Sequence, residues 1–123
     1  MSQFQNSKRE NKFDLEDRTY YFAKNIRDYV KNCLKKSVSN LEYGKQLIRS
    51  SGSVASNYIE ANECLSKKDF VMRIKICRKE AKESRLWIRL SESRPESEKK
   101  KKDLIDEAEQ LMKIFGAVLE KCK

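Results

Sequence analysis

Residues that interrupt regular structure are scarce in this chain of 123 amino acids, which contains three glycines and one proline. An all-β fold needs many tight turns, and glycine and proline are the residues that most often form them. Lysine, glutamate, leucine and arginine are abundant, and all four favour helix. Because a single core usually occupies roughly 100 to 150 residues, we expect one all-α domain.

Apolar side chains recur at steps of three and four in four successive segments, which is the spacing of one face of an α-helix. The segments run from about Leu15 to Leu34, from Ser39 to Cys64, from Lys67 to Ser91, and from Pro95 towards the C-terminus. Short connections force consecutive helices to alternate in direction. The predicted fold is therefore an antiparallel, up-down four-helix bundle over residues 14–123, preceded by a mobile polar tail at residues 1–13.

Capping residues support the predicted starts of the helices. Ser39 followed by Glu42 has the spacing of a capping box, and Ser66 followed by Asp69 resembles another N-terminal cap. Pro95 is compatible with a first helical turn, because the amides there have no acceptor within the helix. The lysine run at residues 99–102 is interpreted as a solvated surface turn.

The second helix has a weak centre, because the residues from Ser50 to Ser53 have mediocre to poor helix propensity. We expect packing against other helices to hold this stretch in helical form. Gly44, Ser51 and Ala55 would then form a seam of small side chains that lets a neighbouring helix approach closely. A phosphate-binding loop is disfavoured, because the glycine spacing of a P-loop is missing.

The chain carries 28 lysines and arginines against 19 acidic residues, a net charge of +9, and such a surface attracts polyanions. On two helices the cations recur at steps of three and four, so each set forms a stripe along one side. The first stripe contains Lys24, Arg27, Lys31 and Lys35, and the second contains Lys75, Arg78, Lys82, Arg85 and Arg89. Like charges at these spacings repel one another unless an anion neutralises them. The stripes predict contacts with nucleic-acid phosphates, and the alternative is a solvated face bridged by glutamates of neighbouring helices.

The third helix carries a second apolar set, which lies about 120° around the helix from its core face. The core face contains Phe70, Ile74, Cys77, Ala81, Ser84 and Ile88, and the second set contains Met72, Ile76, Trp87 and Leu90. One helix with two apolar faces can serve two interfaces. Because exposed apolar patches usually mark contacts between proteins, the second set predicts an oligomer interface.

Catalytic machinery is not visible in the sequence. The chain has no histidine, which excludes histidine-based triads and the Glu-x-x-His pairs of di-iron bundles. Glu80 and Glu83 are one helical turn apart, a spacing that more often belongs to a salt-bridged surface than to an acid–base pair. We expect a protein that is not an enzyme and that uses no cofactor.

The four cysteines are widely spaced, with no CxxC pair and no histidine to complete a metal site. Cys33, Cys64, Cys77 and Cys122 are therefore expected to be buried thiols within helices, in a reducing compartment. The polar N-terminus lacks the apolar segment of a secretory signal, and no later stretch approaches about 18 uninterrupted apolar residues. We expect a soluble, cytoplasmic protein with no metal and no membrane contact.

Two segments of the chain resemble a known family. SSGSVASNYIEA, which begins at Ser50, and DFVMRIKICRKEAKESRLWIRL, at 69–90, are similar to a bacterial four-helix-bundle family that includes the 23S rRNA intervening-sequence proteins. The resemblance extends from about Phe13 to Leu119, and its most specific parts are the Ser56–Asn57 pair and the stretch ending at Trp87. The chain departs from the family pattern at Ala55, where many members have proline.

Several expectations follow from this resemblance. The family fold is an antiparallel four-helix bundle, and its members are similar to the accessory variability protein of diversity-generating retroelements. That similarity implies a homopentamer with a basic surface and a reverse transcriptase as a possible partner. The family supplies no catalytic residue that could be assigned to this chain.

Composition, charge stripes and resemblance together favour a non-enzymatic, basic, oligomeric module that binds RNA or DNA through the phosphate backbone with little sequence specificity. The alternative is a protein-interaction scaffold or an accessory subunit for a reverse transcriptase or another nucleic-acid enzyme.

Overall fold

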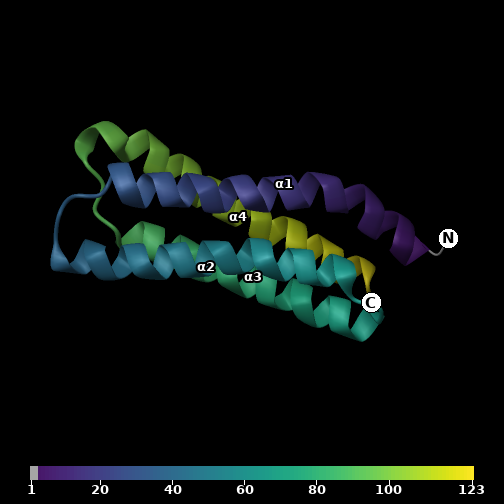
Figure 1. The fold of residues 1–123 in the computed structure, drawn as a ribbon. Coiled ribbons are helices and arrows are strands. Elements are labelled where there is room, and N and C mark those ends of the chain that lie inside the picture. The colour runs from purple at the N-terminus through teal and green to yellow at the C-terminus, as the bar shows by residue number, and fades with distance from the viewer. Residues whose placement is uncertain (1–2) are drawn as a thin grey trace.

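The computed structural model describes residues 3–123, with side chains from Leu15 onward, and its four long helices form an antiparallel bundle (Figure 1). The helices are α1 (Gln3–Asn32), α2 (Val38–Glu63), α3 (Lys67–Leu90) and α4 (Glu98–Lys121), and a short 3₁₀ turn, η1 (Pro95–Ser97), precedes α4. Within the described residues there is no β-strand. The predicted all-α, up-down four-helix bundle is confirmed.

The helices are arranged in chain order around the core. α2 packs between α1 and α3, and α4 packs against α3 and, less extensively, against α1. In the part of the chain that the structure describes, the backbones of α1 and α3 do not come close to each other, so these helices occupy opposite corners of the bundle. The α1–α2 and α3–α4 connections lie at one end of the bundle, and the α2–α3 connection lies at the other (Figure 1).

The core faces follow the helical periodicity. Every residue of the predicted α3 core face is buried, and so are Phe22, Ile26 and Tyr29 of α1 and Leu111 and Phe115 of α4. These side chains meet in one cluster, because steps of three and four bring them to one side of each helix. Residues 1–13, the predicted mobile tail, lie outside the residues whose side chains are described, and that prediction stays open.

Three of the bulky apolar residues of α2 do not belong to the core. Leu41, Ile48 and Ile59 are 61%, 52% and 52% exposed. The three side chains share the outer flank of α2, because their spacings of seven and eleven residues correspond to about two and three helical turns. The core is filled instead by Leu47, Val54 and other residues on the inner side of α2.

The start of α2 also differs from the prediction. Ser37, and not Ser39, is the N-cap, and its side chain accepts a hydrogen bond from the amide of Asn40 at 3.0 Å. Ser39 already lies within the helix, because α2 begins at Val38. The predicted cap of α3 is confirmed, since the Ser66 side chain accepts from the amide of Asp69 at 3.2 Å.

The weak centre of α2 is helical without a break, as expected from its packing. The Ser50 hydroxyl hydrogen-bonds to the Ser84 hydroxyl of α3 at 2.7 Å, and both side chains are buried. On the side facing α1, a Cβ added at Gly44 would lie 2.9 Å from a methyl group of Val30. Tertiary contacts on both flanks therefore hold this sequence in a helix, and Gly44 allows α1 and α2 to approach closely.

The lysine run at residues 99–102 is not a turn, because it forms the start of α4. Pro95 opens the 3₁₀ turn before it, where its missing amide proton costs no helical hydrogen bond. Lys101 is half-buried and donates from Nζ to the carbonyl oxygen of Ser91 at 2.7 Å. The run begins at the second residue of α4, because η1 (Pro95–Ser97) already completes the reversal of the chain.

Candidate nucleic-acid interface

The stripe on α3 is a row of cations along the side of the helix that is turned towards α4. Lys75, Arg78, Lys82 and Arg89 are exposed, and within the described residues no carboxylate lies within ion-pair distance of them. The fifth member, Arg85, is half-buried and donates from Nη1 to Glu109 of α4 at 3.1 Å. Four of the five predicted residues are therefore available to an anion, and the fifth is held by its own bundle.

The stripe on α1 is less uniform. Lys24, Arg27 and Lys31 are exposed on the helix, but Lys35 lies beyond its end, because α1 stops at Asn32. The guanidinium of Arg27 contacts the adjacent Asp28 at 3.1 Å, and the amine of Lys24 lies 6.0 Å from the centre of the Tyr21 ring.

The two stripes do not form one surface. Lys31 and Lys35 lie beside residues of α2, whereas Arg85 reaches α4, and α1 and α3 stand at opposite corners of the bundle. A straight nucleic-acid segment can follow one stripe of a single chain at a time. The α3 stripe is the more continuous of the two, and it ends close to the lysine run of α4, since Lys101 bonds to Ser91 just beyond α3.

A groove between α1 and α2 was missed by reasoning from the sequence. It has a volume of about 480 Å³, and its floor is apolar. The lining contains Val30, Leu34, Leu41 and Ile48, with Lys31, Lys35, Lys36, Lys45 and Arg94 around them. No carboxylate is among the lining residues. The exposed flank of α2 gives no sequence signal of its own, because apolar residues at helical spacing look the same whether another helix covers them or not.

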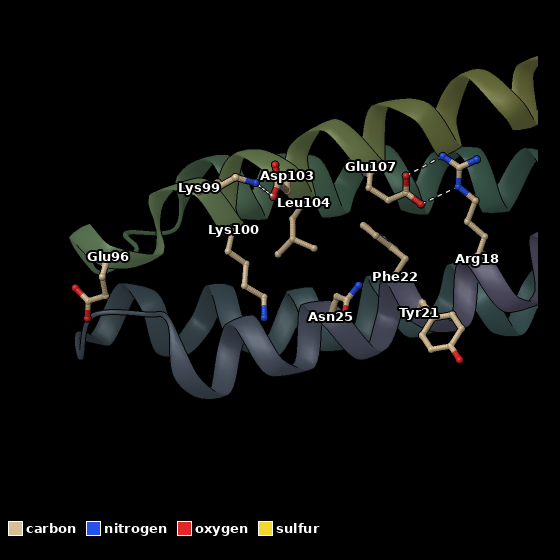
Figure 2. A pocket seen from close by; sticks show the side chains of 10 residues that line it. All are labelled: Arg18, Tyr21, Phe22, Asn25, Glu96, Lys99, Lys100, Asp103, Leu104 and Glu107. Carbon is tan, nitrogen blue, oxygen red and sulfur yellow. Dashed lines mark hydrogen bonds and ion pairs between the residues drawn. The ribbon is translucent and has the colours of Figure 1, made fainter.

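A second cavity, of about 710 Å³, lies where α1 and α4 close the bundle (Figure 2). Phe22 and Leu104 lie between the two helices, and most of the charged side chains around them are paired. Arg18 donates to Glu107 through two nitrogens at 2.8 and 2.9 Å, and Lys99 lies 2.9 Å from Asp103. Because these charges neutralise one another, the cavity is a weaker candidate for an anion than the α3 stripe.

The predicted oligomer interface is divided between exposed and half-buried side chains. Met72 and Leu90 are 52% and 45% exposed, whereas Ile76 and Trp87 are half-buried. The Trp87 ring stacks on Tyr43 of α2 with 6.0 Å between the ring centres. The set therefore lies on the flank of α3 next to α2, and Trp87 also joins these two helices to each other.

A carboxylate pair sits between α2 and α3, opposite Arg49. Glu80 is buried and lies 2.9 Å from the Arg49 guanidinium, and the more exposed Glu83 lies 3.5 Å from it. Burial alone raises the pKa of Glu80, but hydrogen bonds from Ser53 and Glu83 and the charge of Arg49 together hold that pKa below its usual range. The hydrogen bond to Glu80 raises the pKa of Glu83. The pair is salt-bridged, as its spacing in the sequence suggested, but Glu80 is buried and the bridge joins two helices.

None of the four cysteines forms a disulfide in the described structure, but three of them lie at helix ends and not within helices as expected. Cys33 follows α1, and Cys64 and Cys122 are the C-caps of α2 and α4, where both are half-buried. Cys77, within α3, is fully buried, and desolvation raises its pKa to about 12. Among the described residues, no group of acidic residues and cysteines is placed to hold a metal ion, and no helix has the length and apolarity to cross a bilayer.

Fold and surface define this protein as a basic, all-helical bundle protein with a charged α3 flank. The chain belongs to the 23S rRNA-intervening sequence protein family, which matches it over residues 11–117. The resemblance seen in the two sequence segments is thus confirmed.

A solved structure shares this fold. It is a protein with unknown function from the S23 ribosomal protein family of Bacteroides thetaiotaomicron, and it superposes with a TM-score of 0.70 at 25% sequence identity. The similarity covers 85% of this chain and 97% of that protein. Comparison with curated proteins gives no significant match.

Proposed function

We propose that this chain is a non-enzymatic module that binds RNA through its phosphate backbone, with the α3 stripe as the contact surface. The observation that carries this proposal is the row of four exposed cations, Lys75, Arg78, Lys82 and Arg89, without carboxylate partners in the described structure. RNA is favoured over DNA because the family name refers to intervening sequences of 23S rRNA.

The dimensions of the stripe suit a nucleic-acid backbone. The fourteen residue-to-residue steps from Lys75 to Arg89 span about 21 Å at 1.5 Å per step. This length corresponds to roughly six nucleotide steps at about 3.4 Å per step along a duplex strand. Lysine and arginine at these positions would contact phosphates and not base edges, so we expect little sequence specificity.

Assembly into a homopentamer is the second part of this proposal, and it rests on the family resemblance together with the exposed Met72 and Leu90. A ring would repeat the α3 stripe around its axis and multiply the phosphate contacts. The alternative role, as an accessory subunit of a reverse transcriptase or another nucleic-acid enzyme, would use the same basic surface. Light scattering on the purified chain tests the assembly, and a monodisperse monomer at micromolar concentration would rule it out.

The RNA contact is tested by the salt dependence of binding. Affinity for a mixed-sequence RNA should fall linearly on a log–log plot against salt, because phosphate contacts release counterions. Replacing Arg78, Lys82 and Arg89 by glutamine should weaken binding and reduce the slope by up to about 3, one unit for each lost contact.

A charge-conserving variant serves as the matched control. Lys82→Arg with Arg89→Lys keeps both cations in place, so affinity and slope should stay close to those of the parent protein. If the glutamine variant binds RNA as tightly as the parent with the same slope, the α3 stripe is only a solvated surface and this function is wrong.

A further inference from the structure

We propose that the groove between α1 and α2 is a docking site for an acidic, amphipathic helix of a partner protein, separate from the α3 stripe. The groove combines two features that a solvated surface seldom has together. Its floor exposes large apolar side chains, Leu41 at 61% and Ile48 at 52%, and its rim is formed by cations.

The spacing of the floor matches a helix as the occupant. Leu41 and Ile48 are seven residues apart, so they project from the same side of α2 about 10.5 Å apart along its axis. A partner helix with apolar residues at i, i+4 and i+7 presents anchors at the same interval. Past Ile48, an added Cβ at Gly52 would meet no atom within 4 Å, so the flank stays open towards the exposed Ile59.

The rim determines the charge of the occupant. Lys31, Lys35, Lys36 and Arg94 have no carboxylate within ion-pair distance in the described structure, and Lys45 has a loose contact of 3.6 Å with Glu42. A partner helix with glutamates or aspartates beside its apolar anchors would neutralise these cations while it covers the floor.

The groove is also held in shape before any partner binds. The amide of Lys35 donates to the carbonyl oxygen of Glu92 at 3.0 Å, and the amide of Arg94 donates to that of Cys33 at 2.8 Å. These bonds fix the backbone of both loops that supply the rim. A preorganised site loses less conformational freedom on binding, so more of the contact energy appears as affinity.

Two other occupants fit these features less well. RNA would neutralise the rim, but the lining offers no aromatic ring for a base to stack on, and the apolar floor would remain without a matching surface. A second copy of this chain would offer its acidic residues within a surface of net charge +9, so it complements the cationic rim less well than an acidic helix does.

The test uses a fluorescent synthetic peptide with leucines at i, i+4, i+7 and i+11 and glutamates elsewhere, together with a scrambled peptide of the same composition. Fluorescence anisotropy should show binding of the patterned peptide to the parent protein, and the scrambled peptide should bind about tenfold more weakly. Leu41→Ser with Ile48→Ser should weaken the patterned peptide by about tenfold or more, because each change removes an apolar contact from the floor. Lys31→Gln with Lys35→Gln should weaken it and reduce its salt dependence.

Leu65→Ser is the matched control, because it removes a fully exposed leucine from the α2–α3 connection, away from the groove. It should leave peptide binding unchanged. Circular dichroism should show the same thermal unfolding for Leu41→Ser with Ile48→Ser as for the parent, since both side chains are more than half exposed.

Three results would overturn the proposal. Equal binding of the patterned and scrambled peptides would reduce the groove to a non-specific cationic surface. Loss of RNA affinity in Leu41→Ser with Ile48→Ser would make it a nucleic-acid site, and a lower oligomer mass in that variant would show that a second copy covers it. The outcome does not depend on the α3 stripe, because the RNA proposal is tested with variants of α3.

Discussion

Asn40 at the start of α2 holds the backbone of Glu92, 52 residues further along the chain, through both atoms of its side-chain amide. Its Nδ2 donates to the Glu92 carbonyl oxygen at 2.9 Å, and its Oδ1 accepts from the Glu92 amide at 2.9 Å. Nδ2 also donates to the carbonyl oxygen of Lys35 at 2.7 Å. One buried side chain thus joins the α1–α2 and α3–α4 connections.

Asn40→Ala should therefore destabilise the protein by about 2 kcal/mol, because three hydrogen bonds are lost at a site that is 3% exposed. Urea unfolding followed by circular dichroism measures this difference. Asn25→Ala removes an exposed asparagine from α1 and should change the free energy of unfolding by less than about 0.5 kcal/mol. Equal effects of the two changes would mean that the Asn40 contacts contribute nothing to stability.

Gly44 should not tolerate a larger side chain. Gly44→Leu is expected to cost about 1–3 kcal/mol of stability, because even a Cβ lies 2.9 Å from the short, branched side chain of Val30. Gly116→Ala is the matched control in α4, where an added Cβ meets no atom within 4 Å. That change should stabilise the protein by up to about 1 kcal/mol through helix propensity. Thermal unfolding of both variants tests whether Gly44→Leu lowers the stability and Gly116→Ala raises it.

Arg85 and Arg78 should contribute unequally to RNA binding, although both belong to the α3 stripe. Arg85→Gln should change RNA affinity less than Arg78→Gln. The Arg85 guanidinium is paired with Glu109 at 3.1 Å, so it would have to break this ion pair before it could contact a phosphate. Arg78 is exposed and has no such partner among the described residues. Filter-binding or anisotropy titrations at low salt compare the two variants, and a larger effect of Arg85→Gln would contradict the assigned ion pair.

Acid should weaken the contact between α2 and α3. The pKa of Glu80 is lower in the folded protein than in the unfolded chain, so the unfolded state takes up its proton first as the pH falls. The stabilisation from Glu80 is complete above the unfolded value of about 4.3 and is lost as the pH falls through the folded value. The raised pKa of Glu83 acts in the opposite direction and offsets part of this loss.

Glu80→Gln should accordingly make the free energy of unfolding less dependent on pH in the acid range. The measurement is urea unfolding at several pH values from neutrality down to about pH 3. If the free energy of unfolding of the variant falls as steeply with decreasing pH as that of the parent, other carboxylates determine the acid sensitivity.

The sequence was sufficient for the fold because helix formation and helix burial both leave a periodic signal. Apolar residues at steps of three and four identified the buried faces of α1, α3 and α4, and the Ser66 cap located the start of α3. It was also sufficient for the family, since the two segments carry specific residues. It misplaced the cap of α2, because Ser37 and Ser39 offer the same chemistry and only the path of the connection decides between them.

What the sequence determined by itself is therefore which residues share one side of one helix, because that relation depends only on 3.6 residues per turn. Only the tertiary structure decided which neighbouring helix, if any, covers a given side of each helix. It separated the α1 and α3 stripes to opposite corners, paired Arg85 with Glu109, and left Leu41 and Ile48 exposed beside Lys31. These relations join residues that are distant in the chain, and packing of whole helices sets them, so no local spacing can show them.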